Sequence, residues 1–290
     1  MAVSLPNTDY LEIESAHVGA TFAVWVTRPV GYESAGSARY PAIYATDGNW
    51  LAGLLSPLAE LTAFDRLEEF PPYLQVTVGY VPADLTQWHL LRVRDLIPPG
   101  EPLSASTSEA IAAEVESAGL SAAERKGVLE IFENTRADRF LRFLEEELRP
   151  QIEDRYRVEP GSAGLFGFSY GGLFTLYALF EGRGMFSRFG AGSPGVMTPE
   201  SEIFRLQREA SESGRSFGGA RLHITVNERE LLGKTPAYRD HCIQAVHLID
   251  EIYRGDQKEL VVSGRVLPGD THATGTTQAF VSFLQQFYGR

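Results

Sequence analysis

The chain contains only one cysteine, Cys242, so no disulfide can form within it. A reducing cytoplasm is therefore the expected compartment, and the helical surroundings "RDHCIQAVHLID" favour a small buried side chain as the role of this cysteine. No apolar run approaches the ~18 residues of a membrane span. The N-terminal stretch also lacks the basic start and the apolar run of a signal peptide. We expect no membrane partner.

Basic residues are also scarce. Lys and Arg number 26 against 38 Asp and Glu, and the resulting net charge of −12 argues against nucleic acid as a partner. The sequence has no GxxxxGK[ST] loop for phosphates, no GxGxxG in its first βα unit, no HExxH and no pair of cysteines. We therefore expect neither a bound cofactor nor a metal ion.

Alternating strands and helices dominate what is present. Residues 10–15 and 21–27 alternate apolar and polar side chains, as strands with one wetted face do. Short apolar strands are predicted at 42–45, 74–81 and 163–168, and later strands alternate with amphipathic helices. This order predicts a single α/β domain over residues 1–290, with a mostly parallel central sheet and helices on both of its faces.

Two segments do not fit this simple alternation of strands and helices. Residues 98–134 contain no predicted strand and are typical of two helices broken at Gly119, and residues 197–218 contain another short helix. Both follow the C-terminal ends of strands, where open α/β sheets bind ligands. We interpret both as lid or cap insertions. Insertions without a functional role are the alternative.

The stretch "GFSYGG" places Ser169 between two glycines, after a predicted strand and before a predicted helix. This is the pattern of a nucleophile elbow, in which a sharp strand-to-helix turn exposes a serine. Ser169 is therefore the candidate nucleophile. The backbone N–H of Tyr170, at the start of the helix, is a candidate donor to the oxyanion that acyl transfer creates.

A serine nucleophile needs a histidine base, and in a sheet of this type the chain order is serine, acid, histidine. Of the six histidines, His272 lies in the Gly-rich loop "LPGDTHATG" after the last predicted strand. His89 precedes the elbow, His223 lies inside a strand, and His241 lies in a helix, as does His247. His272 is the candidate base.

The acid that orients the base is open among three carboxylates. Glu228 and Glu230 follow the strand "RLHITV", and Asp270 stands two residues before the candidate histidine. A second oxyanion donor is expected beside the strand 42–45. Asn49, just after an Asp-Gly turn, is the candidate by position.

Several blocks of the chain resemble the putative-esterase branch of the α/β-hydrolases, which includes siderophore trilactone esterases, feruloyl esterases and S-formylglutathione hydrolase. The resemblance implies an α/β-hydrolase fold, Ser169 as nucleophile, His272 as base and Glu230 as acid. It also implies the backbone N–H groups of Tyr170 and Asn49 as oxyanion donors. The blocks are "YPAIYATDGNW", "RVRDLIPP", "AGLFGFSYGGLFTLYAL", "FGAGSPGV" and "PGDTHAT".

These features predict a hydrolase that cleaves a small-molecule carboxylic ester through an acyl-serine intermediate. Two other functions remain open at this stage. One is an acyltransferase that uses the same triad with an alcohol or amine acceptor. The other is a non-catalytic binding module on the same fold.

Overall fold

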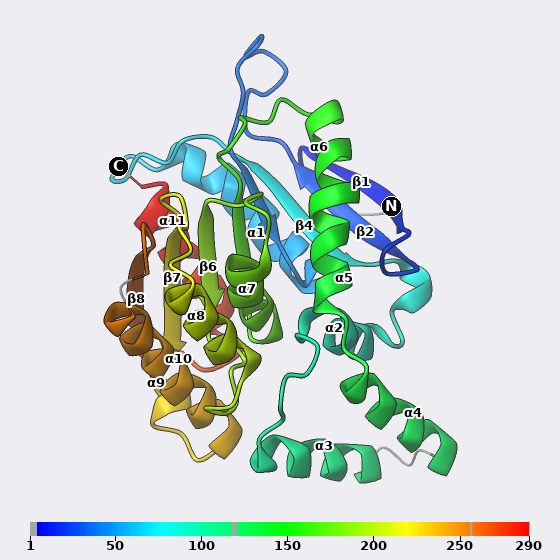
Figure 1. The fold of residues 1–290 in the computed structure, drawn as a ribbon. Coiled ribbons are helices and arrows are strands. Elements are labelled where there is room, and N and C mark those ends of the chain that lie inside the picture. The colour runs from blue at the N-terminus through cyan, green and yellow to red at the C-terminus, as the bar shows by residue number, and fades with distance from the viewer. Residues whose placement is uncertain (1–4, 118–120, 256, 290) are drawn as a thin grey trace.

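A twisted sheet forms the centre of the protein in the computed structural model, which describes residues 5–117, 121–255 and 257–289 (Figure 1). The strand order is β1-β2-β4-β3-β5-β6-β7-β8. β1 pairs antiparallel with β2, and β2 pairs antiparallel with β4, whereas every pairing from β4 to β8 is parallel. The strands are β1 (Thr8–Ser15), β2 (Ala20–Thr27), β3 (Ala42–Ala45), β4 (Leu74–Tyr80), β5 (Gly164–Phe168), β6 (Arg188–Gly192), β7 (Arg221–Asn227) and β8 (Val261–Leu267).

Helices cover both faces of the sheet, which is why the central strands β3, β4 and β5 are buried along their whole length. One face packs against α1 (Gly48–Leu61) and α11 (Gly275–Phe287). The other packs against α7 (Tyr170–Glu181) and the helices around it. These are α2 (Trp88–Leu96), α5 (Ala137–Arg142), α6 (Arg149–Arg155), α8 (Glu202–Glu212) and α10 (Pro236–Arg254), while the four-residue α9 (Glu228–Leu231) follows β7 directly. The expected fold class is confirmed.

The insertion at 98–134 contains α3 (Ala105–Ser117) and α4 (Ala122–Glu133), whereas Gly119 lies outside the described residues. Both helices project beyond α2 and the first turns of α10, at the end of the sheet where the parallel strands finish (Figure 1). The Oγ atom of Ser106 donates to Oδ2 of Asp240 in α10 at 3.2 Å. This position agrees with a cap, and its role as a lid stays a prediction.

Glu101, near the start of this insertion, connects it to helix α8. One carboxylate oxygen accepts the backbone N–H of Glu202, the first residue of α8, at 3.0 Å. Burial raises the pKa of Glu101 to about 7, although its hydrogen bonds partly oppose that rise. A carboxylate at a helix N-terminus also faces the positive end of the helix dipole.

The segment 197–218 differs from the sequence-based expectation. α8 is the crossover helix between β6 and β7 and packs against α7. Ile203, Phe204 and Leu206 are buried in the same core as the sheet. The apolar stripe of α8 therefore completes the layer that covers the sheet, and it does not form a second lid.

The turn from β5 into α7 is sharp, and two of its positions have no room for a side chain. Ser169 has φ 60° and ψ −120°, a conformation that L-residues rarely adopt. A Cβ on Gly167 would lie 2.0 Å from the carbonyl oxygen of Gly171, and a Cβ on Gly171 would lie 2.3 Å from Oγ1 of Thr46. Gly167 and Gly171, the glycines on either side of Ser169, are therefore required because neighbouring atoms leave no room for a side chain.

We predict that Gly167→Ala destabilises the protein by about 1–3 kcal/mol or more, because its methyl group meets backbone atoms that cannot rotate away. Gly53, in the exposed part of α1, has nothing within 4 Å of its ideal Cβ. Gly53→Ala should therefore be neutral or stabilising by up to about 1 kcal/mol. Urea denaturation of the two variants tests this difference. Equal stabilities would show that the turn tolerates a side chain.

Candidate active site

Ser169 is held at the apex of the elbow by backbone hydrogen bonds on both sides. Its N–H donates to the carbonyl oxygen of Gly192 at the end of β6, at 2.9 Å. Its own carbonyl oxygen accepts from the N–H groups of Leu173 and Gly195, each at 2.9 Å. Among the described residues, none forms a hydrogen bond with the Ser169 hydroxyl. The backbone is thus fixed while the side-chain oxygen stays available.

His272 and Glu230 contact each other directly. His272 lies in the loop between β8 and α11, and its Nδ1 atom is hydrogen-bonded to Oε1 of Glu230 in α9. Glu230 is 3% exposed. Burial raises the pKa of this carboxyl, but hydrogen bonds from His272 and Ser193 outweigh burial and leave the pKa of Glu230 below its usual value. The carboxylate therefore stays charged beside the imidazole.

Of the two other candidate carboxylates, Glu228 lies in α9 and Asp270 lies in the loop that carries His272. Oε2 of Glu228 accepts the backbone N–H of Gly269 at 2.7 Å. Asp270 accepts the N–H of Arg229 at 3.0 Å through its backbone carbonyl oxygen. Both residues therefore connect the loop that carries His272 to α9.

A cavity of about 360 Å³ contains both Ser169 and His272. Its wall is mostly apolar, and Trp50 and Leu54 at its rim are 55% and 47% exposed. Such a concave apolar site with a few convergent polar groups is the usual form of a small-molecule site. The lining residues are Asp47, Trp50, Leu51, Leu54, Arg92, Phe168, Ser169, His272, Ala273 and Thr276.

The cavity also holds a buried ion pair that the sequence did not identify as part of the site. Nε of Arg92 lies 2.7 Å from Oδ1 of Asp47, and Nη2 lies 3.1 Å from Oδ2. The guanidinium lies near the rings of Trp50 and Tyr170, at 5.6 and 5.1 Å from their centroids. Burial lowers the pKa of Arg92, but Asp47 outweighs it and raises the pKa above its usual value. In the sequence, Asp47 lies in "TDG" and Arg92 lies in "RVRD", and these two motifs are the signals that could have pointed to the ion pair.

The two expected oxyanion donors lie in different surroundings. Tyr170 is the first residue of α7, directly after Ser169. Asn49 lies in the first turn of α1, and its side chain both donates to and accepts from the backbone of Tyr80, at 2.8 Å each way. Asp47, two residues earlier, lines the cavity, whereas Asn49 is not among its lining residues. The assignment of Asn49 stays a prediction.

Aromatic rings flank the imidazole of His272. Tyr238 of α10 stacks on it with 4.4 Å between centroids and 14° between planes, and Phe168 lies 5.0 Å away. The ring of the buried His241 lies 6.1 Å from that of Tyr238 and 6.4 Å from that of His272. Among the described residues, neither ring nitrogen of His241 has a hydrogen-bond partner. Burial lowers the pKa of His241 to about 4, and it lowers that of His223 in β7 to about 4 as well.

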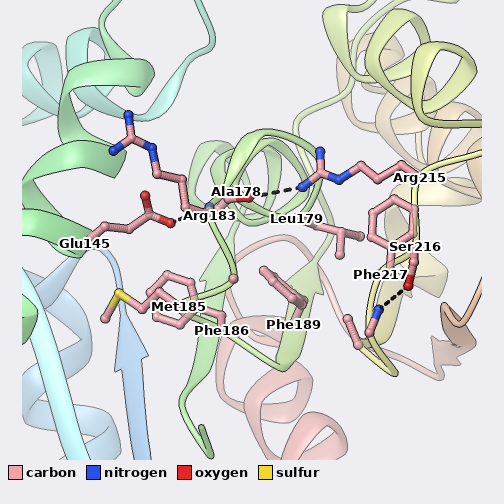
Figure 2. A pocket seen from close by; sticks show the side chains of 14 residues that line it. Glu145, Ala178, Leu179, Arg183, Met185, Phe186, Phe189, Arg215, Ser216 and Phe217 are labelled. Atoms are coloured by element: carbon pink, nitrogen blue, oxygen red, sulfur yellow. Dashed lines mark hydrogen bonds between the residues drawn. The ribbon is translucent and has the colours of Figure 1, made fainter. Parts of the chain in front are cut away.

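Another hollow, of about 410 Å³, lies under the C-terminal end of α7 (Figure 2). Its polar groups already bind neighbouring groups of the chain. Nη2 of Arg215 donates to the carbonyl oxygen of Gly182 at 3.1 Å, and Glu145 accepts the N–H of Arg183 at 2.8 Å. The elbow, the histidine and the carboxylate all lie elsewhere, so this hollow is not the candidate active site.

Comparison with known proteins agrees with the fold. Residues 120–251, which include Ser169 and Glu230, match the family described as "Putative esterase". The chain is 28% identical over 197 residues to the ferri-bacillibactin esterase BesA of Bacillus subtilis, covering 67% of this chain and 61% of that protein. It is 37% identical over 98 residues to the siderophore enterobactin esterase of Emericella nidulans, covering 32% of each.

Among solved structures, the siderophore hydrolase EstA of Aspergillus nidulans superposes with a TM-score of 0.76 at 21% identity, covering 99% of this chain and 97% of that one. The family match therefore covers somewhat less than half of the chain, and the superposition shows a shared fold. The chain spans less than two thirds of the length of the curated relatives it matches. Within the described residues, no helix is both long enough and apolar enough to span a membrane.

The two buried histidines generate a prediction about stability in acid. Their folded pKa values of about 4 lie below the ordinary value of 6.5, so the unfolded chain binds more protons between pH 6.5 and 4. The stability that each contributes is present above pH 6.5 and is lost as the pH falls toward 4. Between pH 7 and pH 5 the loss is roughly 2 kcal/mol per histidine.

Glu101 titrates in the same window with the opposite sign, because its folded pKa is raised. The comparison is therefore between wild type and His241→Leu, which removes one titrating group and leaves no hydrogen-bond partner unpaired. Going from pH 7 to pH 5, the variant should lose roughly 2 kcal/mol less stability than wild type in urea denaturation. Parallel losses in the two proteins would contradict a neutral buried His241.

Proposed function

We propose that the protein is a serine esterase that cleaves a carboxylic ester of a small molecule. The observation that carries this proposal is that His272, which is hydrogen-bonded to Glu230, lines the same cavity as Ser169 at the strained elbow. Ser169, Glu230 and His272 follow the chain order serine, acid, histidine, and a serine, a carboxylate and an imidazole are the parts of an acyl-transfer triad.

In the proposed reaction, Nε2 of His272 takes the proton of the Ser169 hydroxyl as its Oγ atom attacks the ester carbonyl carbon. Glu230 keeps Nδ1 protonated and stabilises the imidazolium that forms. The oxyanion accepts hydrogen bonds from the backbone N–H of Tyr170 and, by position, of Asn49. The imidazolium then protonates the leaving alcohol, and water activated by His272 hydrolyses the acyl-serine.

The substrate class is proposed from the cavity and from the relatives. The relatives' names describe esterases of siderophores, which are small molecules. The cavity of about 360 Å³ and its exposed apolar rim at Trp50 and Leu54 suit an ester with an apolar or aromatic part. We also propose a cytoplasmic location, because Cys242 is unpaired and buried.

We predict that Ser169→Ala lowers kcat by about 10⁴- to 10⁶-fold, because the members of a triad act as a unit. The variant should also lose labelling by a fluorophosphonate probe while its urea midpoint stays near that of wild type. A panel of p-nitrophenyl esters of graded acyl length, with siderophore lactones added, supplies the activity measurement. Retention of more than about a tenth of the wild-type kcat would remove Ser169 from the nucleophile role.

The identity of the acid is tested by three matched amide substitutions. Glu230→Gln should lower kcat by about 10²- to 10⁴-fold with little change in KM, because the carboxylate acts on the imidazolium of the transition state. Asp270→Asn and Glu228→Gln keep the loop contacts nearly intact and should stay within about tenfold of wild type. If Asp270→Asn is the crippled variant while Glu230→Gln is active, the orienting acid is Asp270.

A further inference from the structure

Ser193 is a buried serine at the end of β6 whose hydroxyl points at the candidate acid. Its Oγ atom donates to Oε2 of Glu230 at 2.6 Å. The backbone N–H of Asn227 and the thiol of Cys242 also approach Oε2, but at 3.4 and 3.5 Å. Oε1 is engaged by His272. The serine therefore holds the one carboxylate oxygen that the imidazole does not.

The same segment is bonded to the nucleophile elbow. Gly192 accepts the N–H of Ser169, and Gly195 donates to the Ser169 carbonyl oxygen, each at 2.9 Å. An ideal Cβ on Gly172, at the start of α7, would lie 3.0 Å from the Cα of Pro194. The four residues 192–195 thus touch the serine through their backbone and the acid through one side chain.

The backbone at Ser193 is itself constrained. Its φ is 36°, in the left-handed region, and its N–H donates to the carbonyl oxygen of Thr225 in β7 at 2.7 Å. Such strain persists only where the surroundings fix it, and it clusters at functional sites. Here it turns a residue from the end of β6 toward α9, where Glu230 lies. The side chain is 1% exposed, so water does not compete for the carboxylate.

We propose that Ser193 is a positioning residue of the active site, which fixes the Glu230 carboxylate against His272 and ties the acid to the elbow that carries Ser169. This inference rests on the proposed esterase function. Ser193 touches no substrate, so it acts through Glu230. Without its hydroxyl, Oε2 would keep only two long contacts, and the carboxylate would be freer to turn away from Nδ1.

The Ser193 hydroxyl also affects the negative charge of the Glu230 carboxylate that faces His272. A donor on Oε2 withdraws charge from the carboxylate and lowers the pKa of Glu230. Removing this donor makes the carboxylate more basic and stabilises the imidazolium form of His272. Several other titratable or charged groups surround the pair. They are His241, Cys242 and Tyr238 on α10, Arg229 on α9, and Asp47 with Arg92 across the cavity.

The experiment compares wild type, Ser193→Ala and Ser193→Gly in hydrolysis of p-nitrophenyl acetate and in labelling by a fluorophosphonate. Both variants lose the hydroxyl, and the glycine variant also relieves the positive φ. We expect kcat to fall by about tenfold or more in both, as for loss of a hydrogen bond to a charged group, with KM within about twofold. The acid limb of kcat/KM should shift, to higher pH if the more basic carboxylate still faces Nδ1 and to lower pH if it has turned away.

Ser282→Ala is the matched control, because it also removes a buried serine hydroxyl bonded to a buried side chain, Nε2 of His223 at 2.9 Å. It should leave kcat and the acid limb unchanged. If wild type is labelled and active but Ser193→Ala keeps the wild-type kcat, or its acid limb is unmoved, the positioning role is wrong and the esterase function stands. If wild type neither hydrolyses esters nor labels, the proposed function itself fails.

Discussion

The rest of the site depends on the backbone conformation of Ser169. A non-glycine residue at φ 60° and ψ −120° costs of order 1–3 kcal/mol, and it persists because the surrounding contacts leave no alternative. Gly167 and Gly171 allow the chain to double back, and the carbonyl of Gly192 fixes the Ser169 N–H from the neighbouring strand. These contacts place the hydroxyl at the C-terminal edge of the sheet, where the loops after β3, β7 and β8 also meet.

The charged groups at this edge are buried, and each is satisfied by a partner from another element. Glu230 from the β7 side is bonded to His272 and Ser193, and Asp47 after β3 is bonded to Arg92 of α2. Burying a carboxylate without partners costs several kcal/mol, so the structure depends on these contacts at both acids. The Ser169 hydroxyl differs from them, since no described residue forms a hydrogen bond with it. It is the polar group that the site leaves for a ligand.

Much of this arrangement could be predicted from local sequence. The elbow and its glycines are contiguous, so the pattern "GFSYGG" carries the strand, the turn and the helix in one stretch. The loop histidine could be chosen because His223 and His241 lie in regular elements, and the structure buries both of them. The choice among Glu228, Glu230 and Asp270 could not be made by periodicity, because all three lie near the same loop and only the orientation of each side chain separates them.

What the sequence could not give is the contacts between distant elements. Arg92 and Asp47 are 45 residues apart, and Ser193 and Glu230 are 37 apart, so no local pattern links them. The helix at 202–212 was misinterpreted for a related reason: its apolar stripe looks the same whether it covers a sheet or a cavity. Contact with α7 decides between these, and contact is a property of the folded chain. A π-helical segment, Phe143–Leu148, was missed as well, because its residues are ordinary helix formers.

The position of Ser193 shows how one strand end can contact two parts of the proposed site that the chain keeps far apart. In a parallel sheet, neighbouring strands finish at the same edge, so the loop after β6 lies between the loops after β5 and β7. A residue there can contact the elbow on one side and the acid on the other. A small hydroxyl suits that place, since Ser193 is buried there and reaches the carboxylate at 2.6 Å. The order of the strands thus sets which segment can align the acid with the serine.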